Sequence, residues 1–502
     1  MGKAFDALSA HLREIDHIEA ALELMGWDQQ VLMPPEADEA RAAQLETLSR
    51  LSHEKFTSEQ TLRLLDAAEA EISGADPDSD QARLISVVRQ DYAEQTRLPS
   101  ELVAEVTRVT AMAHGVWAAA RAENDFARFA PTLTRQFELA RQTADYLGYS
   151  EHPYDALLNL FERGMTSRQV QAIFEEHKAG LVKLIAAISE RTDSVDDSPV
   201  HQAFDVEAQR QFGLKVIGAI GFDFKRGRQD VSVHPFAQST SKYDVRITTR
   251  FSPDFLNPAL FGMMHETGHA MYEQGISDDL AALPPLDNGT SLGVHESQSR
   301  MWENIVGRSH GFWTWAYPQL QAAFPAQLGG VNVEQFYRAV NKVTPSYIRV
   351  EADEATYNLH IMLRFELEMA LLNGQLAVAD LPRAWNERFE AYFGIVPPTD
   401  SLGVLQDVHW SSGLIGYFPT YELGNMLAAQ YYRKAIVDRP QIPADIANGK
   451  FDTLLGWLRE NIHQHGRKFT ADELTRRITG EGIQQRYYLE YLQEKYGAIY
   501  GL

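Results

Sequence analysis

The chain has 502 residues, of which 44% are hydrophobic and 23% are charged, a balance typical of a globular protein and not of a disordered or fibrous one. Its 46 Lys and Arg side chains against 69 Asp and Glu side chains give a formal charge of -23, which would repel nucleic acid and anionic membrane surfaces. It contains no cysteine, so disulfides and thiolate metal sites are excluded and zinc ligands would have to be His or carboxylate side chains.

The N-terminal segment is amphipathic and lacks the continuous apolar run of a signal peptide. Phe5, Leu8, Leu12, Ile15 and Ile18 recur at helical spacing, which predicts a helix with one buried face. No segment approaches the roughly 18 consecutive apolar residues of a membrane-spanning helix. We therefore expect a cytoplasmic protein that does not bind membranes.

Helical periodicity continues from Ala4 to about Arg191, broken by turn signals such as Leu98-Pro99-Ser100. This half predicts antiparallel helices, and the polar stretch from Thr192 to Val200 predicts a linker or a surface loop. Further helices are expected over roughly Leu292 to Ser309, Val333 to Asn373, Leu381 to Phe393 and much of the remainder to Tyr500.

Residues 231–249 depart from the helical pattern. VSVHPF and YDVRITT alternate in hydropathy, and a Ser/Thr-rich turn at Gln238 to Ser241 separates them, which predicts a strand pair. In the second strand Asp244, Arg246 and Thr248 share one face because side chains alternate with period two. The pair is either a half-exposed hairpin or a sheet edge beside a cleft, which a bound peptide could extend.

The segment NPALFGMMHETGHAMYEQG predicts a helix with Asn257 as its N-cap and Gly275 at its end. His265 and His269, four residues apart, project from one face and can bind one metal ion. Glu266 is rotated by about 100° and lies beside the ion. A carboxylate there can take a proton from metal-bound water. The alternative is a structural helix that happens to carry two histidines.

A catalytic zinc ion needs a third protein ligand, and Glu296 is the best candidate. It opens the next predicted helix, after a Pro/Gly-rich loop long enough to bring that helix across the first. Glu273 would lie about 12 Å from His265 along the same helix, and Glu303 lies about two turns beyond Glu296. Neighbouring His295 either orients a metal ligand, contacts the substrate, or is a packed, hydrogen-bonded histidine.

Gly289 to Gly293 reads GTSLG and matches the G-x-S-x-G motif of serine hydrolases. That motif needs a strand directly before the serine, and the preceding residues, Ala282 to Asn288, are rich in proline and polar residues. The local sequence therefore disfavours a serine nucleophile.

A polar stripe recurs at intervals of three and four residues in IRVEADEATYNLHIMLRFELE. Such a stripe is either a solvated helix face or a buried network lining a cleft, and its mixture of Arg, Tyr and His with carboxylates favours the network. Arg349 could pair with a substrate carboxylate in a bidentate way, or simply with Asp353. The stripe consists of Arg349, Asp353, Tyr357, His360, Arg364 and Glu368.

Several longer motifs accompany HETGH along the chain. They are WD at Trp27-Asp28, HPF at His234 to Phe236, DVRIT at Asp244 to Thr248, HESQ at His295 to Gln298, IRVEADEATY, GVLQDVHW at Gly403 to Trp410 and GYFPTYELGN at Gly416 to Asn425. With these motifs the chain resembles the carboxypeptidase Taq family, also called thermostable carboxypeptidase 1.

The resemblance implies a mainly α protein, a single large helical domain over residues 1–502 with a deep active-site groove. We expect a helical N-terminal part over about 1–200, a zinc-site part over about 201–502, and the small β-sheet beside the HExxH helix. Family members are usually homodimers that remove single residues from the C-termini of peptides. The resemblance therefore implies peptide substrates with a free C-terminus, and a Zn²⁺ cofactor that Co²⁺ can replace.

The resemblance also assigns residues. It supports Glu296 as the third ligand and implies that His409 and Tyr421 bind the oxyanion, with Tyr417 as a competing phenol. We expect Arg349, together with Arg246 and His234, to bind substrate. The alternatives are an oligoendopeptidase with the same zinc chemistry and a metal-bearing helical protein without catalysis.

Overall fold

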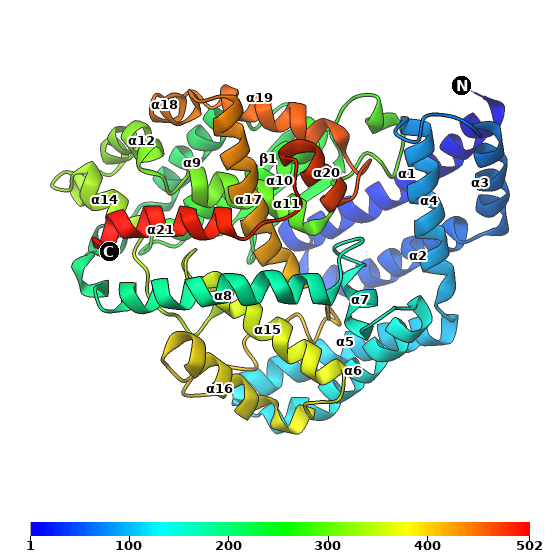
Figure 1. The fold of residues 1–502 in the computed structure, drawn as a ribbon, viewed down its shortest axis with the longest axis horizontal. Helices are drawn as coiled ribbons and strands as arrows, with labels where there is room; N and C mark the ends of the chain where they lie inside the picture. The colour runs from blue at the N-terminus through cyan, green and yellow to red at the C-terminus, as the bar shows by residue number, and fades with distance from the viewer. Residues whose placement is uncertain (1) are drawn as a thin grey trace. The chain divides into compact units, whose positions relative to one another are not determined.

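The computed structural model describes residues 2–502 and is mainly helical, which confirms the predicted fold class (Figure 1). It contains two compact units, each assembled from separated parts of the chain. Unit 1 comprises the chain up to Thr96, Asp196–Val340 and Ala428–Gly482, and unit 2 comprises Arg97–Val195, Asn341–Leu427 and Ile483–Leu502. The organisation as one domain, with a division near residue 200, stays a prediction.

The helices of unit 1 begin with amphipathic segments of the kind predicted. Phe5, Leu8, Leu12 and Ile15 are buried in one apolar cluster with residues of the next three helices. The helices of this unit are α1 Lys3–Val31, α2 Asp38–Phe56, α3 Glu59–Glu71, α4 Asp80–Arg97, α9 Val206–Ile220, α10 Asn257–Gly275, α11 Leu292–Arg300, α12 His310–Ala323, α13 Pro325–Leu328, α14 Val333–Val340, α18 Ile442–Ala447, α19 Asp452–Asn461 and α20 Ala471–Thr479.

Unit 2 is helical, and two of its long helices, α6 and α8, carry polar caps at their N-termini. Thr166 and Gln169 form a reciprocal capping box at the start of α8, and Asp125 caps α6. Its helices are α5 Ser100–Glu123, α6 Phe126–Leu147, α7 Pro153–Leu158, α8 Ser167–Ser189, α15 Tyr357–Leu372, α16 Leu381–Phe393 and α21 Arg486–Tyr500, and α17 Pro419–Asp438 contributes residues to both units.

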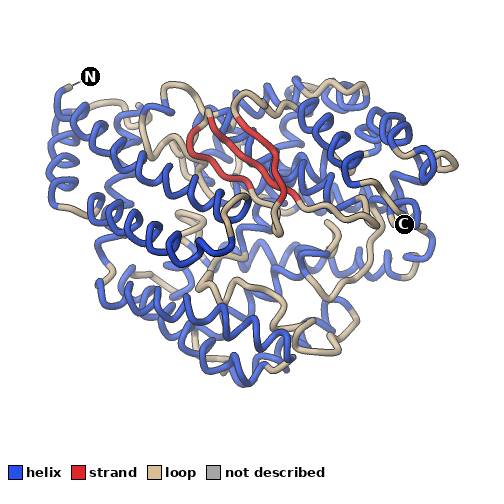
Figure 2. The backbone as a smooth tube through the Cα atoms, turned by 180° about the vertical axis from the view of Figure 1, so that it is seen from behind, coloured by secondary structure: helices blue, strands red, loops and turns tan. Residues whose placement is uncertain are grey.

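A three-stranded sheet in unit 1 has the order β1-β3-β2 (Figure 2). Strand β1 (Gly227–Val231) is parallel to β3 (Asp244–Thr249), and β2 (Ala237–Ser241) is antiparallel to it. The predicted turn at Gln238 to Ser241 is therefore wrong, because these residues form most of β2. Pro235 interrupts the predicted first strand, since proline cannot donate a ladder hydrogen bond.

The sheet lies beside the HETGH helix, as predicted. Val245 and Ile247 of β3 are buried together with Met263 and Ala270 of α10. Burial alternates as predicted from Asp244 to Ile247, but Thr248 and Thr249 are both buried, so the period-two pattern is confirmed only for the first four residues of the strand. The sheet thus supports one side of the helix that carries the candidate metal ligands.

Two predicted helices are interrupted. The segment from Val333 to Asn373 consists of α14, a 3₁₀ turn at Arg349–Glu351 and α15, so the polar stripe does not lie on one continuous helix. Pro345 explains the break, because proline disfavours helix in the residue before it and removes a backbone donor. The helix that begins at Leu292 changes to π-helix at Met301–Val306.

The remaining helix predictions agree more closely with the structure. Leu381–Phe393 is helix α16, and Thr192 to Val200 holds only two short 3₁₀ turns. Helix α10 starts at Asn257, so this residue is the first of the helix and not its N-cap, which is Leu256. Within residues 2–502, no helix is both long enough and apolar enough to cross a membrane.

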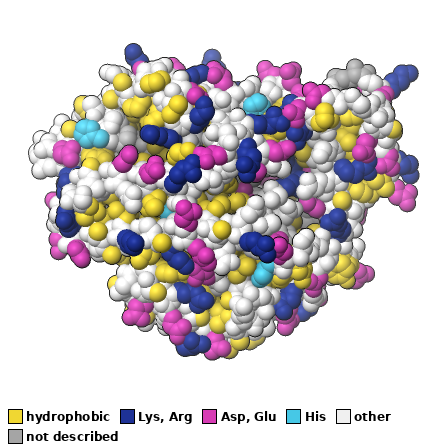
Figure 3. Space-filling view, in the orientation of Figure 1, with side chains coloured by type: hydrophobic (Ala, Val, Ile, Leu, Met, Phe, Trp, Pro, Cys, Tyr) yellow, Lys and Arg dark blue, Asp and Glu magenta, His cyan; other side chains and the backbone are white. Residues whose placement is uncertain are grey.

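Acidic and basic side chains are interspersed over the face of the molecule seen in Figure 3. Many of them form ion pairs between neighbouring segments, such as Arg89 with Asp66 and Arg135 with Glu105. The net charge of -23 therefore coexists with extensive local pairing of opposite charges.

Candidate active site

Gly268, inside HETGH, allows helix α11 to approach helix α10. A Cβ atom at this position would lie 2.5 Å from the carbonyl oxygen of Gln298 and 2.5 Å from the Cα of Ser299. These are backbone atoms, which cannot move aside as a flexible side chain can, so the crossing requires glycine. The close crossing brings Glu296 of α11 opposite the two histidines of α10.

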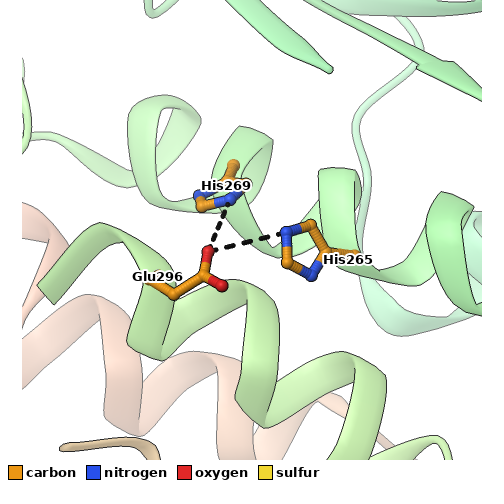
Figure 4. A group of neighbouring side chains, drawn as sticks. All are labelled: His265, His269 and Glu296. Carbon is orange, nitrogen blue, oxygen red and sulfur yellow. Dashed lines mark ion pairs between the residues drawn. The ribbon is translucent and has the colours of Figure 1, made fainter. Parts of the chain in front are cut away.

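The three predicted ligands form one cluster (Figure 4). His265 and His269 extend from α10, and the Oε2 atom of Glu296 lies 3.5 Å from the Nε2 of His265 and 3.3 Å from the Nε2 of His269. Two ligand atoms at about 2.0–2.1 Å from a tetrahedral zinc ion would lie about 3.3–3.4 Å apart. The spacing of these donor atoms therefore fits a tetrahedral metal ion.

The charges around the cluster also fit a cation. Glu266, Glu296 and Glu303 bring three carboxylates, and Arg300 donates to Glu296 at 2.7 Å and to Glu303 at 3.2 Å. Burial raises the pKa of Glu266 to about 7. Burial also opposes ionisation of Glu303, but Arg300 and His265 lower its pKa to about 2. Arg308 adds a second guanidinium 3.8 Å from Glu303, so three carboxyl groups face two guanidinium groups, and a divalent cation would favour the ionised form of all three.

The two histidines differ in their electrostatic surroundings. Burial lowers the pKa of His269 to about 4. Burial acts on His265 in the same direction, but the carboxylates of Glu296 and Glu303 raise the pKa of His265 to about 9. The two pKa values differ because Glu303 contacts His265 and not His269, and because the neighbouring imidazoles of His295 and His265 lower the pKa of His269 further.

Glu303 and Glu273, the two less favoured candidates for the third ligand, are each linked by side-chain contacts to one of the two histidines. Glu303 Oε2 lies 2.8 Å from the Nδ1 of His265. Glu273 Oε1 lies 2.7 Å from the Nε2 of His295, whose Nδ1 lies 2.6 Å from the Nδ1 of His269. One signal of this arrangement is visible in the sequence, since Glu296, Arg300 and Glu303 recur at helical spacing, but the π-helix that contains Glu303 could not be foreseen.

The motif GTSLG has a structural role at the start of α11. The Oγ of Ser291 accepts a hydrogen bond from the backbone N–H of Val294 at 3.0 Å, so Ser291 is the N-cap of the helix. No strand precedes it among the described residues 282–290. The nucleophile-elbow geometry is thus missing.

Unit 2 holds several of the other predicted residues in a cluster centred on Asp407. Arg349 donates from Nε at 3.1 Å and from Nη2 at 2.8 Å to Oδ1 of Asp407, and from Nη1 to the hydroxyl of Tyr357 at 2.7 Å. Arg364 donates to Oδ2 of Asp407 at 2.6 Å. Asp353, the expected alternative partner of Arg349, instead accepts hydrogen bonds from backbone N–H groups, among them that of Thr344.

The Asp407 cluster carries two guanidinium groups for one carboxylate. Arg349 is 5% exposed and Arg364 is fully buried. Burial opposes ionisation of Asp407, but Arg349 and Arg364 hold its pKa well below its usual range. The three side chains therefore carry a net charge of +1 in a largely buried position.

His409 and Tyr421 lie against the same cluster. The Nε2 of His409 is 3.2 Å from the hydroxyl of Tyr421, and its ring packs on that of Phe418. Burial lowers the pKa of His409 to about 3, so the imidazole is neutral at neutral pH. The Tyr417 ring centre lies 5.3 Å from that of Tyr421. The structure thus brings His409, Tyr421 and Arg349 together within unit 2.

Arg246 and His234 lie in unit 1, near the sheet. Arg246 donates to Asp244 at 2.9 and 2.8 Å, and its guanidinium carbon lies 4.4 Å from the ring centre of Trp27, which is 2% exposed. His234 is exposed, and its backbone carbonyl accepts a hydrogen bond from Ser232. Arg246 is therefore already paired, whereas His234 offers an accessible ring.

Comparison with known proteins decides the family. Residues 7–496 match the family described as carboxypeptidase Taq (M32) metallopeptidase. The chain belongs to the carboxypeptidase Taq family. It is 42% identical to thermostable carboxypeptidase 1 of Thermus thermophilus, with 99% of each chain covered, and 38% identical to carboxypeptidase 1 of Bacillus subtilis, with 97% of each covered.

A solved structure supports the same membership. The crystal structure of the M32 carboxypeptidase from Deinococcus radiodurans matches the whole of both chains with a TM-score of 0.97 and 43% identity. The carboxypeptidase Taq family consists of metallopeptidases, so this chain is a metallocarboxypeptidase, a metal-dependent peptide hydrolase. The prediction of function made from the motifs is thereby confirmed.

Proposed function

We propose that His265, His269 and Glu296 bind a zinc ion, which cobalt can replace. The observation that carries this proposal is the 3.3–3.5 Å spacing of their donor atoms, which fits tetrahedral coordination. Two imidazoles and one carboxylate are also a donor set found in catalytic zinc sites. When bound there, zinc lowers the pKa of a coordinated water and polarises a carbonyl group.

Glu266 is the proposed general base. It follows His265 directly on α10 and is only 6% exposed, so its carboxylate is shielded from bulk water. In this role Glu266 accepts a proton from the attacking water and delivers it to the leaving amine. His409 and Tyr421 are proposed to donate hydrogen bonds to the carbonyl oxygen as it gains negative charge, with Tyr417 as the competing phenol.

Arg349 is the proposed partner of the substrate's terminal carboxylate. Its support is the charge of the Asp407 cluster, in which two guanidinium groups share one carboxylate. A protein with a net charge of -23 needs such a local cation to attract an anion. Arg246, which Asp244 already pairs, and the exposed His234 are further substrate-binding candidates.

A dipeptide with a blocked N-terminus distinguishes carboxypeptidase from endopeptidase action. We expect release of the last residue from the free acid, loss of release with a chelator, and recovery with zinc or cobalt. The C-terminal amide of the same peptide should be a much poorer substrate. Equal cleavage of the acid and the amide would indicate an oligoendopeptidase, and metal binding without turnover would indicate a non-catalytic protein.

Four variants test the assigned residues. We expect His265→Ala, His269→Ala and Glu296→Ala each to lose the metal, measured by elemental analysis after dialysis. Glu266→Gln should retain the metal and lose about 10²–10⁴-fold in kcat, the usual contribution of a general base. Full zinc occupancy in Glu296→Ala would contradict the ligand assignment.

The proposed working state is a cytoplasmic homodimer, as the family resemblance implies. Sedimentation velocity of the purified chain should give the mass of two copies, about 113 kDa from 56.6 kDa per chain. A single species of 56.6 kDa across the working concentration range would contradict the dimer.

A further inference from the structure

Each proposed ligand histidine contacts a second side chain through the ring nitrogen that does not face Glu296. The Nδ1 of His265 lies 2.8 Å from Glu303, and the Nδ1 of His269 lies 2.6 Å from His295. A ring nitrogen binds a metal only through a free lone pair. The position of the ring proton therefore decides whether Nε2 can act as a ligand.

Glu303 determines the proton position on His265. An ionised carboxylate can only accept a hydrogen bond, so its contact requires a proton on Nδ1, and Nε2 is the nitrogen that offers a lone pair once the metal displaces its proton. Arg300 holds this carboxylate at 3.2 Å while its Nε donates to Oε1 of Glu296 at 2.7 Å. One guanidinium thus fixes both the proposed ligand carboxylate and the carboxylate behind His265.

Glu273 determines the proton positions in the second chain of contacts. Its carboxylate lies 2.7 Å from the Nε2 of His295, so that nitrogen must carry the proton and the Nδ1 of His295 must accept. The Nδ1 of His269 is then the donor, and its Nε2 keeps the lone pair. Gly289 leaves room for the His295 ring, because a Cβ there would lie 2.6 Å from the ring.

We propose that Glu303 and His295 are positioning residues that fix the tautomers of His265 and His269, so that both Nε2 atoms are ready to bind the metal. The inference rests on the proposed zinc site. Glu303 acts directly and is held by Arg300, whereas His295 acts through its ring, which Glu273 contacts on the other side. Glu303 lies in a π-helical segment, and such segments occur frequently at functional sites.

Zinc affinity of the metal-free protein, measured by competition with a chromogenic chelator at fixed pH, tests the role of Glu303. Glu303→Ala should weaken binding about 10–100-fold, the usual effect of removing a residue that orients a ligand. Glu303→Gln keeps an oxygen that can accept from Nδ1, so its affinity should stay within a few-fold of the wild type. Glu334→Ala, on an exposed side chain of the same unit, is the control and should change nothing.

Two outcomes would overturn the role of Glu303. Glu303→Ala with wild-type zinc affinity would show that the contact does not prepare His265. Glu303→Gln as weak as Glu303→Ala would show that only the charge matters and not the hydrogen bond. If circular dichroism shows that Glu303→Ala does not fold, the two variants of His295 decide the proposal.

For His295, a matched pair of variants distinguishes the effect of the hydrogen bond from the effect of the ring shape. His295→Phe keeps an aromatic ring without nitrogen and should weaken zinc binding about 10–100-fold. His295→Asn places an acceptor oxygen near the former Nδ1 and should recover most of the affinity. Wild-type affinity in His295→Phe would overturn the role of His295.

His265→Ala in the same assay separates this inference from the proposed function. Loss of zinc in His265→Ala with wild-type affinity in Glu303→Ala and His295→Phe would reject only the positioning roles. Retention of zinc in His265→Ala would reject the proposed metal site itself.

Discussion

Arg349 is held by Asp407 and Tyr357 within its own unit, so its guanidinium has a fixed orientation. If it binds the substrate's terminal carboxylate, Arg349→Met should lower kcat/KM for free-acid peptides by about 10–150-fold, equivalent to about 1.5–3 kcal/mol for a charge-assisted hydrogen bond. C-terminally amidated peptides should lose much less, because they lack the charge. Steady-state kinetics with both substrate types measures the difference.

Arg246→Met tests the competing candidate for this role, since Arg246 is likewise paired with an aspartate. It should affect acid and amide substrates to the same small extent. A selective loss on acid substrates in Arg246→Met, with equal losses on both in Arg349→Met, would move the carboxylate-binding role to Arg246.

Glu368 is a fully buried carboxyl group in unit 2 that accepts three hydrogen bonds. They come from the indole of Trp410 at 2.8 Å, the hydroxyl of Tyr154 at 2.8 Å and the backbone N–H of Gly416 at 3.2 Å. Burial raises the pKa of Glu368 to about 7, even though these donors favour the ionised form. The group therefore titrates near neutral pH in the folded protein.

The raised pKa predicts a pH-dependent contribution to stability. The folded state binds the proton more tightly than the unfolded state, so the contribution is fully present below pH 4.5 and is lost as the pH rises through about 7. The slope is at most about 1.4 kcal/mol per pH unit. Glu368→Gln cannot titrate, so wild type should lose stability relative to this variant between pH 5 and 8 in denaturant unfolding. A constant difference over that range would contradict the prediction.

The clustering of His265, His269 and Glu296 could be predicted from sequence because its geometry is local. His265 and His269 share a helix face at a spacing of four, and Glu296 follows within one connecting loop. The partner of Arg349 could not be predicted in the same way, since Asp407 lies 58 positions away and reaches it only through the fold. Long-range side-chain pairs leave no periodic signal in one sequence.

At the scale of elements, the crossing of α10 and α11 depends on Gly268. We expect Gly268→Ala to push the helices apart, because the new Cβ would lie 2.5 Å from backbone atoms of Gln298 and Ser299. Overpacking of this kind typically costs about 1–3 kcal/mol. It should also weaken zinc binding, since Glu296 moves with α11. The unfolding midpoint measures the loss of stability, and chelator competition measures the change in zinc affinity.

Gly26→Ala is the control for this substitution. Gly26 lies inside α1 with no atom within 4 Å of the position of a Cβ, so alanine should stabilise the helix by up to about 1 kcal/mol. If Gly268→Ala were also neutral or stabilising and kept its zinc affinity, the close crossing would not control the site.

The errors in predicted elements have identifiable causes. Pro345 lies inside the segment predicted as one helix, and Pro235 lies inside a predicted strand, so both breaks could have been foreseen. Strand β1 could not, because its partner β3 is parallel to it and begins 17 residues after the first residue of β1. Helix α16 was predicted correctly since its apolar spacing is regular and Gly394 ends it.

On the scale of the whole molecule, each unit draws together parts of the chain that are hundreds of residues apart. In unit 1, several ion pairs join the region around α4 to the region around α20. Arg467 binds Asp91, Lys468 binds Asp80 and Arg83 binds Glu473. These contacts connect early and late segments of the sequence, so amphipathic patterns alone could not predict them.

The Asp91–Arg467 pair is the strongest candidate for a stabilising link within this group. Both guanidinium Nη atoms donate to Asp91, at 2.7 and 2.8 Å, and the aspartate side chain is only 12% exposed. Asp91→Asn replaces one acceptor by a donor that faces the guanidinium, so we expect a loss of about 1–3 kcal/mol in the free energy of unfolding.

Asp66→Asn is the comparison, because Asp66 pairs with Arg89 through one contact and is 61% exposed. Exposed pairs of this kind contribute about 0–1 kcal/mol, since solvent and salt screen them. Urea unfolding of both variants at low and at 1 M salt measures the two contributions. Equal losses in the two variants would mean that the link between the early and late segments of unit 1 depends on apolar packing and not on the bidentate pair.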